Sequence, residues 1–292
     1  MNAHGDCEYV VTGAKGQLGS EMCRILGQSC RGQGFAELDI CDKQLVTGYL
    51  HRHKPRVVIN CAAYTAVDQA EDFADQCQRV NAVAVGHLAE ITAEIGATLI
   101  QVSTDYVFGN PPNPPHPFTE ETPTSPVGVY AQTKLEGEQQ AAKNPKHMVV
   151  RTCGLYGQSE RPSSGNFVTT MIRLGRERDF VSVVNDQHCT PTSVKELARA
   201  IAFLADSSPA PGIYHVVNQG ETTWFEMAKE TFRIAKIDCE VKPITSDEFG
   251  AKAPRPPYSV LNADKYHALD GPRMSTWQDA LTSYIRETLK IE

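Results

Sequence analysis

The sequence lacks a basic excess and a cysteine framework, and each absence excludes a class of protein. Its formal net charge is -7, from 28 lysines and arginines against 35 aspartates and glutamates. Nucleic acid is therefore not expected as the main partner, because its phosphates are neutralised by basic residues. The nine cysteines are an odd number and none stand at C-x-x-C spacing. A disulfide framework and a zinc site are not expected, whereas a reducing cytoplasm is.

Long apolar runs are also missing. No run reaches the roughly 20 residues that a membrane-spanning helix needs, and residues 1–8 are polar, without the apolar centre of a signal peptide. We therefore expect a cytoplasmic protein with no membrane partner. The chain is 41% hydrophobic and 22% charged, which is typical of a globular protein. Its 292 residues suffice for one large α/β unit or two packed lobes.

What the chain does contain, in its first half, is a regular alternation of short apolar runs and helical stretches. Strands are expected at residues 9–11, 56–61, 98–102 and 147–150, and helices at residues 17–26, 70–95 and 129–142. The strands are apolar throughout, as strands covered on both faces are. This order predicts an α/β fold with a doubly wound parallel sheet of the Rossmann type.

The second half of the chain is less regular. Helices are expected at residues 167–176, 194–205, 224–234 and 277–289, with a strand at residues 212–217. The proline-rich residues 110–126 predict no regular element. We place a dinucleotide-binding domain at residues 1–157 and a smaller C-terminal substrate lobe at residues 158–292, with segments that can return to the sheet.

A glycine-rich segment follows the first expected strand. Gly13, Gly16 and Gly19 form the pattern G-x-x-G-x-x-G directly before a helix, which is typical of a dinucleotide-binding loop. The glycines permit a tight turn, a close approach to a pyrophosphate and close helix packing, and the helix N-terminus offers free N–H groups to phosphates. A glycine-rich turn without a ligand is the alternative.

The choice between NADH and NADPH depends on charges near the adenosine ribose. An acidic residue is expected about 20 residues after the loop to bind the ribose of NAD, and Asp39 fits this count. Its Leu-Asp-Ile setting favours adenine contact instead, and a helix cap or turn is the structural alternative. Residues 30–35 hold no carboxylate and one charge, Arg31. We therefore expect NADPH to bind at least as well as NADH, with Arg31 or Lys15 adding attraction, unless Asp39 reaches the ribose.

Tyr130 and Lys134 form a Y-x-x-x-K pattern. On a helix this spacing puts both side chains on one face. A nearby ammonium lowers the pKa of a tyrosine, so the phenol can exchange a proton near neutral pH, and the lysine can hold the nicotinamide ribose. Thr104 follows the strand at residues 98–102, at the sheet edge where ligands bind, and can hydrogen-bond a carbonyl oxygen. A solvated Tyr/Lys face and a strand end rich in Ser and Thr are the alternatives.

Together these segments resemble the extended short-chain dehydrogenases and, within them, the dTDP-4-dehydrorhamnose reductases. The runs Ala-Ala-Tyr-Thr-Ala-Val-Asp at residues 62–68 and Ser-Thr-Asp-Tyr-Val-Phe at residues 103–108 are far more specific to this group than the glycines are. The matching segments span nearly the whole chain and comprise residues 11–19, 58–71, 80–82, 103–108, Tyr130 with Lys134, 166–168, 184–187 with 190–192, 223–225, and 254–256 with Ser259 and Leu261.

The resemblance implies NAD(P)H-dependent reduction of the C4 ketone of dTDP-4-dehydro-L-rhamnose to dTDP-L-rhamnose. Tyr130 would donate the proton, and Lys134 would adjust the pKa of Tyr130 and hold the nicotinamide ribose. Thr104 would polarise the ketone, and Asn81 would support the site. The implied cofactor residues are Gly13, Lys15, Gly16, Gln17, Leu18, Gly19, Asp39, Ile40, Ala62, Ala63, Tyr64, Tyr130 and Lys134. The implied substrate residues are Thr65, Val67, Thr104, Asp105, Asn166, Trp224 and Arg255. Arg255 would meet the diphosphate; a surface ion pair for Arg255 and a core position for Trp224 are the alternatives.

One departure from the group concerns the sugar pocket. Gly154 stands where relatives usually have a tryptophan that shapes this pocket, so a roomier pocket is expected here. Two other functions stay open: a non-catalytic NADP-binding regulatory subunit similar to that of methionine adenosyltransferase, and a reductase or epimerase of another nucleotide deoxysugar. We expect a small-molecule dTDP-sugar partner, a monomer or homodimer, and no protein-bound metal; a requirement for Mg²⁺ is not readable from the sequence.

Overall fold

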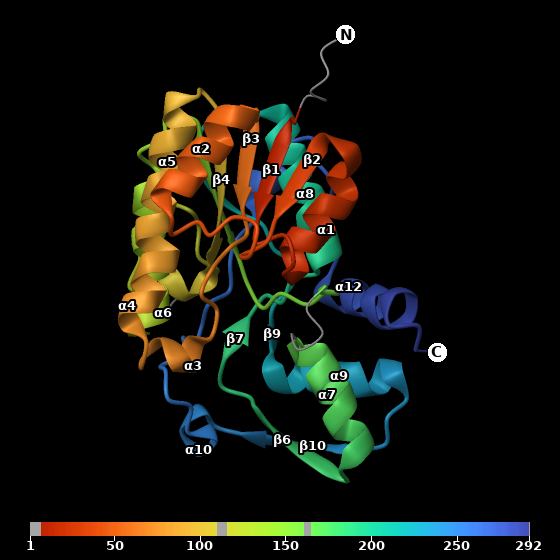
Figure 1. The fold of residues 1–292 in the computed structure, drawn as a ribbon. Coiled ribbons are helices and arrows are strands. Elements are labelled where there is room, and N and C mark those ends of the chain that lie inside the picture. Colours follow the sequence, from red (N-terminus) through yellow and green to blue (C-terminus); the bar gives the residue numbers. More distant parts are fainter. Residues whose placement is uncertain (1–6, 110–115, 161–164, 292) are drawn as a thin grey trace.

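Six strands form one parallel sheet in the order β2-β1-β3-β4-β5-β8 (Figure 1). The computed structural model of the chain describes residues 7–109, 116–160 and 165–291. The strands are β1 (Tyr9–Thr12), β2 (Cys30–Gln33), β3 (Val57–Asn60), β4 (Thr98–Thr104), β5 (His147–Thr152) and β8 (Gly212–His215). The strand order reverses direction between β1 and β3, where sheets of this type bind ligands. The predicted doubly wound parallel sheet is confirmed.

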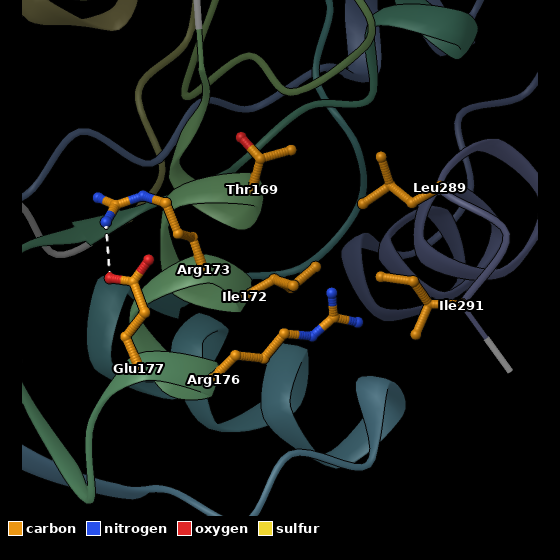
Figure 2. Close-up of a pocket in the computed structure, with 7 residues that line it drawn as sticks. All are labelled: Thr169, Ile172, Arg173, Arg176, Glu177, Leu289 and Ile291. Carbon is orange, nitrogen blue, oxygen red and sulfur yellow. Dashed lines mark hydrogen bonds and ion pairs between the residues drawn. The ribbon is translucent and has the colours of Figure 1, made fainter.

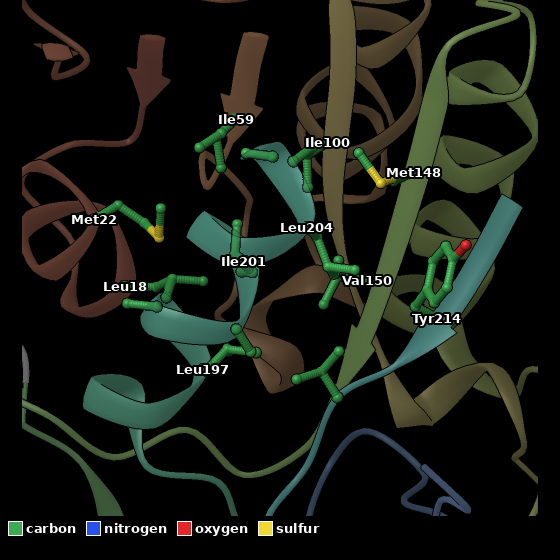
Figure 3. Close-up of a cluster of buried hydrophobic side chains, with 14 of the residues drawn as sticks. Leu18, Met22, Ile59, Ile100, Met148, Val150, Leu197, Ile201, Leu204 and Tyr214 are labelled. Carbon is green, nitrogen blue, oxygen red and sulfur yellow. The ribbon is translucent and has the colours of Figure 1, made fainter. Parts of the chain in front are cut away.

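Helices cover both faces of this sheet. Alternate strand residues point to opposite faces. On one face, Val11, Ile59, Ile100 and Val150 pack against α1 (Gln17–Leu26) and α8 (Val194–Ser207) (Figure 3). On the other face, Val10, Val58, Leu99 and Val149 pack against α2 (Lys43–His53), α5 (Ala84–Glu94) and α6 (Gly128–Ala141). Because both faces are buried, the strands are apolar at successive positions.

The chain after residue 157 contributes to the sheet and also builds a lobe beneath it. The helix α8 and the strand β8 return to the sheet. In the lobe, β6 pairs with β10 in parallel, and β7 pairs with β9 in antiparallel fashion. Besides α8 and β8, this half of the chain contains α7 (Phe167–Glu177), β6 (Phe180–Val184), β7 (His188–Cys189), β9 (Thr222–Thr223), α9 (Trp224–Ala235), β10 (Glu240–Ile244), α10 (Ser246–Phe249), α11 (Asp264–His267), α12 (Trp277–Ser283) and the π-helical turn η4 (Tyr284–Thr288).

The single helix expected at residues 70–95 is interrupted in the structure. It is replaced by α4 (Ala74–Gln78), the π-helical turn η2 (Arg79–Val83) and α5, and α3 (Val67–Ala70) precedes them. Short 3₁₀ turns also occur at η1 (Gly27–Ser29) and η3 (Asp105–Val107). A π-helical turn is uncommon and is often found at functional sites.

Two elements give little sequence signal for physical reasons. In α2 the buried residues are Val46 and Leu50, which make only a narrow apolar stripe. The strand β2 lies at the sheet edge and is polar, so burial imposes no apolar pattern on it. Of the proline-rich segment, residues 110–115 lie outside the described residues, and residues 116–126 contain no helix or extended strand. No helix in the described ranges is long and apolar enough to cross a membrane.

Candidate active site

The loop between β1 and α1 is built from glycines that leave no room for a side chain. Gly13 has a left-handed backbone, with φ of 65°, and a Cβ atom there would lie 2.7 Å from the amide nitrogen of Ala62. A Cβ atom on Gly19 would lie 2.2 Å from the carbonyl oxygen of Gly13. The loop therefore folds tightly against the first turn of α1 and the segment after β3.

The N-terminus of α1 faces a cavity. Gly16 is the N-cap residue, and within the described chain no side chain caps this end of the helix. Gly16, Gln17 and Leu18 all line the cavity. Free N–H groups and the positive end of the helix dipole thus point at it, and these features bind phosphates at other helix N-termini.

This cavity measures about 780 Å³ and lies at the carboxyl ends of β1, β3, β4 and β5. All of the predicted site residues line it except Lys15, Asn166 and Arg255. Those that line it are Gly13, Gly16, Gln17, Leu18, Gly19, Asp39, Ile40, Ala62, Ala63, Tyr64, Thr65, Val67, Thr104, Asp105, Tyr130, Lys134 and Trp224. Segments that are far apart in the sequence therefore meet at one site.

Tyr130, Lys134 and Thr104 stand together within this cavity. Tyr130 and Lys134 are one turn apart on α6, and Thr104 ends β4 and hydrogen-bonds the Tyr130 phenol. Lys134 is buried, and its Nζ donates a hydrogen bond of 2.6 Å to the carbonyl oxygen of Val102. Burial lowers the pKa of Lys134 to about 8.

The effect of this environment on Tyr130 differs from the prediction. The sequence predicted that Lys134 lowers the pKa of the phenol. In the structure, burial instead raises the pKa of Tyr130, and the hydrogen bond with Thr104 only partly opposes this change. The phenol therefore keeps its proton at neutral pH, which suits a proton donor better than a proton acceptor.

The π-helical turn η2 holds the loop after β3 in place. Asn81, which is buried in this turn, accepts a hydrogen bond of 2.9 Å from the Tyr64 amide and donates one of 3.1 Å to the Tyr64 carbonyl. The turn also packs closely on α6, since a Cβ atom on Gly137 would lie 2.1 Å from the Asn81 carbonyl oxygen. Asn81 thus ties the cavity wall around Tyr64 to the helix that carries Tyr130.

At the opposite end of the cavity, near β2, two charges neutralise each other. Lys15, in the glycine loop, forms an exposed ion pair with Glu37, and this contact lowers the pKa of Glu37. Asp39 lines the cavity, and its carboxylate accepts a hydrogen bond of 2.9 Å from the Cys41 amide. Glu37, which was not a predicted site residue, places a carboxylate just after β2.

A buried carboxylate lies beside the Tyr130 group. Asp105 is 2% exposed, and burial raises its pKa. Hydrogen bonds from Ser259, at 2.5 Å, and Thr104, at 3.1 Å, oppose this shift, together with one from Cys153. Asp105 therefore presents to the cavity a buried carboxyl group that is held by hydrogen bonds from Ser259, Thr104 and Cys153.

The room expected beside Gly154 is filled from another part of the chain. A Cβ atom on Gly154 would lie 3.0 Å from Cη2 of Trp224, which comes from the first turn of α9. Trp224 lines the cavity and packs on Phe167, with ring centroids 4.8 Å apart. An aromatic wall is thus present, but a different segment supplies it.

Asn166 and Arg255 lie outside the cavity lining. Asn166 caps α7, and its Nδ2 donates to Gln17 Oε1 at 3.2 Å, so it links the lobe to the glycine-loop helix. Arg255 forms a two-pronged ion pair with Asp68, at 2.8 and 3.0 Å. This pair lowers the pKa of Asp68. A ligand that binds Arg255 would have to compete with Asp68.

Other residues that line the cavity were not predicted. Tyr106 packs edge-on against Tyr130, with ring centroids 5.8 Å apart. Thr152 ends β5 at the same sheet edge as Thr104, and Cys153 follows it directly. Their position at the carboxyl end of an apolar strand is the signal that could have identified them. Phe35 also lines the cavity, although it is 71% exposed.

A second cavity, of about 430 Å³, lies between α7 and the end of the chain (Figure 2). It is lined by Thr169, Ile172, Arg173, Arg176, Glu177, Leu289 and Ile291, and Arg173 pairs with Glu177 at 2.9 Å. None of these was a predicted site residue. Among residues 7–109, 116–160 and 165–291, no group of three or more His, Cys, Asp or Glu side chains could hold a metal ion.

Comparisons with known proteins agree with this geometry. The family model described as RmlD substrate binding domain matches residues 8–290. The chain is 41% identical to a dTDP-4-dehydrorhamnose reductase of Streptomyces griseus, over 97% of this chain and 94% of that protein. A crystal structure of a dTDP-4-dehydrorhamnose reductase from Clostridium acetobutylicum is similar, with TM-score 0.91, 39% identity and coverage of 97% and 99%. Another, from Bacillus anthracis in complex with NADP, has TM-score 0.90, 36% identity and coverage of 96% and 98%.

Proposed function

The chain belongs to the family of the RmlD substrate binding domain, and on this basis we propose that it is a reductase of a dTDP-linked keto-sugar. The reaction is reduction of the C4 ketone of dTDP-4-dehydro-L-rhamnose to dTDP-L-rhamnose, with NADPH or NADH as reductant. The observation that carries the proposal is one cavity with a phosphate-binding glycine loop at one end and Tyr130, Thr104 and Lys134 at the other.

The cavity suits a nicotinamide dinucleotide along its length. Gly13, Gly16 and Gln17 would hold the pyrophosphate at the N-terminus of α1. Lys134 would hold the nicotinamide ribose. The buried hydroxyl of Thr152 lines the cavity and has no hydrogen-bond partner among the described residues, which is expected where a ligand supplies one. Bound NADPH or NADH supplies the hydride.

Tyr130 and Thr104 would act on the ketone oxygen. The Tyr130 phenol donates its proton to the developing alkoxide, and the Thr104 hydroxyl polarises the ketone by hydrogen bonding. The raised pKa of Tyr130 keeps the phenol protonated until this step. Thr65, Val67, Asp105 and Trp224 would contact the sugar. We further infer a cytoplasmic monomer or homodimer; all nine cysteines are free thiols, as in proteins of a reducing compartment.

The test is oxidation of NADPH by the purified protein in the presence of dTDP-4-dehydrorhamnose. Loss of NADPH absorbance together with formation of dTDP-rhamnose supports the proposal. Tight NADPH binding without turnover of any sugar would instead favour a non-catalytic regulatory subunit. Faster turnover of another dTDP-keto-deoxysugar in the same assay would move the proposal to that sugar.

Cofactor preference should depend on Glu37. In the Glu37→Gln variant, Lys15 loses its partner and a negative charge near β2 is removed, so a ribose 2′-phosphate is attracted more strongly. We expect the ratio of kcat/KM for NADPH over NADH to rise by roughly twofold to fivefold, the scale of an exposed charge pair. Glu90→Gln is the matched control, because it breaks the similarly exposed Lys43–Glu90 pair away from the cavity. An unchanged ratio in Glu37→Gln would show that the Lys15–Glu37 pair does not influence the preference between NADPH and NADH.

Trp224 should matter for the sugar and not for the cofactor. We expect Trp224→Ala to raise the KM for the dTDP-sugar about tenfold, equal to ~1.4 kcal/mol, since an aromatic wall of the cavity is lost. The dissociation constant of NADPH, measured by fluorescence, should stay within twofold or so. Phe225→Ala removes the neighbouring ring, which does not line the cavity, and should leave both constants unchanged. Equal losses for sugar and cofactor in Trp224→Ala would contradict this assignment.

A further inference from the structure

A buried ion pair lies one helical turn beyond Lys134. Glu138 and Arg151 have side chains that are 4% and 3% exposed, and they meet at 2.7 Å between Arg151 Nη2 and Glu138 Oε2. Arg151 Nε donates to both carboxylate oxygens, at 3.0 and 3.2 Å. The Ser103 hydroxyl donates to Oε1 at 2.5 Å. The carboxylate of Glu138 is therefore held by side chains from two strands.

Arg151 is itself fixed on its far side by a neutral histidine. The Nδ1 atom of His215 lies 3.1 Å from the carbonyl oxygens of both Phe118 and Asn262, so this nitrogen carries the proton. The other nitrogen, Nε2, accepts from Arg151 Nη1 at 3.4 Å. Burial and the charge of Arg151 lower the pKa of His215 to about 3, so its ring stays neutral. The ion pair of Arg151 is with Glu138, and its guanidinium also lies over the Phe108 ring, 5.1 Å from the centroid.

Glu138 lies one helical turn from Lys134 on α6, and its negative charge favours the ammonium of Lys134. The groups that shift the pKa of Lys134 are Glu138 on the same helix, Cys61 after β3 and Cys77 on α4. Burial raises the pKa of both thiols, that of Cys61 to about 12, so both are neutral near pH 7. Burial pushes Lys134 toward its uncharged form, and the carboxylate of Glu138 opposes this effect. Stability alone is a weak reason for such a pair, because burying two charges is costly.

We propose that Glu138, held by Arg151 and Ser103, is a positioning residue that keeps the ammonium of Lys134 charged and in place beside Tyr130. Tyr130, Lys134 and Glu138 follow one another at four-residue intervals and share one face of α6. The proposal rests on the proposed reduction, in which Lys134 holds the nicotinamide ribose. Glu138 acts through Lys134 and does not line the cavity.

The experiment is the pH profile of the Glu138→Gln variant. The uncharged amide no longer favours the ammonium, so the pKa of Lys134 falls and its proton is lost at lower pH. Wild-type kcat/KM should decline with a midpoint near pH 8, the pKa of Lys134. In Glu138→Gln we expect this midpoint to move down by about one pH unit. Glu136→Gln, an exposed change of equal charge on the same helix, should leave it in place.

Two outcomes would overturn the proposed role of Glu138. If Glu138→Gln lowers activity by the same factor at every pH, Glu138 has only a structural role and the proposal is wrong. If that variant does not fold because Arg151 is left unpaired, the double variant Glu138→Gln/Arg151→Met removes both charges and fills the space. Arg151 is a cation paired with Glu138, and its charge opposes that of Glu138 at Lys134. The double variant should therefore show a smaller downward shift than Glu138→Gln, and an unchanged midpoint overturns the proposal.

The pH dependence of NADPH binding separates this proposal from the proposed function. The dissociation constant, followed by NADPH fluorescence, should rise through the titration of Lys134 whether or not the dTDP-sugar is turned over. An absent sugar turnover with a shifted binding profile would reject the substrate and keep the role of Glu138. Normal turnover of the dTDP-sugar, with identical NADPH binding profiles in Glu138→Gln and the wild type, would keep the proposed function and reject the role of Glu138.

Discussion

Replacing Tyr130 with phenylalanine should lower kcat by about a hundredfold or more, the usual scale for losing a positioned general acid. The change removes one hydroxyl, which hydrogen-bonds Thr104 at the end of β4. Without it, the alkoxide that forms on hydride transfer has no proton donor at this position. The dissociation constant of NADPH should change little, because the ring still fills its place on α6.

Tyr106→Phe is the matched control for this prediction. Tyr106 also lines the cavity and packs edge-on against Tyr130, with ring centroids 5.8 Å apart, so this variant removes the equivalent hydroxyl from a neighbouring ring. Single-turnover measurements with saturating NADPH isolate the chemical step from product release. Near-normal turnover in Tyr130→Phe, or equal losses in Tyr130→Phe and Tyr106→Phe, would show that Tyr130 is not the proton donor.

A methyl group on Gly19 should disable cofactor use almost as strongly. In Gly19→Ala, the new Cβ would lie 2.2 Å from the Gly13 carbonyl oxygen and 2.9 Å from the Ala14 Cα, both backbone atoms. The loop has to move, and displacements near 1 Å cost about a hundredfold in kcat/KM. We expect a loss of that size with NADPH, and a decrease of about 1–3 kcal/mol in the free energy of unfolding from overpacking.

Gly48→Ala provides the contrast for this variant. Gly48 lies in the exposed part of α2, and a Cβ atom there would meet nothing within 4 Å. This substitution should stabilise the protein by up to about 1 kcal/mol through helix propensity, with unchanged kcat/KM. NADPH titrations and thermal unfolding of both variants check the pair of expectations. A Gly19→Ala protein that binds NADPH normally would show that the loop tolerates displacement.

Local patterns were sufficient to predict the sheet and the centre of the site. The runs around Val58, Leu99 and Val149 are apolar at successive positions because both sheet faces are covered. The four-residue spacing of Tyr130 and Lys134 depends only on helix geometry. In each case the signal lies within a few neighbouring residues.

Features that depend on distant segments were not predictable in this way. The Lys15–Glu37 pair, the contact of Trp224 with Gly154 and the Arg255–Asp68 pair each join parts of the chain that only the fold brings together. The raised pKa of Tyr130 has the same origin, since it reflects burial rather than the adjacent lysine. The π-helical turn at Asn81 escaped detection because the surrounding apolar spacing is that of an ordinary helix.

The return of α8 and β8 to the sheet has a consequence for synthesis on the ribosome. A nascent chain that ends near residue 157 leaves β5 without its outer neighbour β8. It also leaves Val11, Ile59 and Ile100 without Leu197 and Ile201, which cover them from α8. The glycine loop and the Tyr130 helix are therefore synthesised early, but the sheet that positions them is not fully packed until the chain has reached about residue 216. During that interval the part of the apolar sheet face that α8 covers stays open to water, the state in which chaperones bind nascent chains.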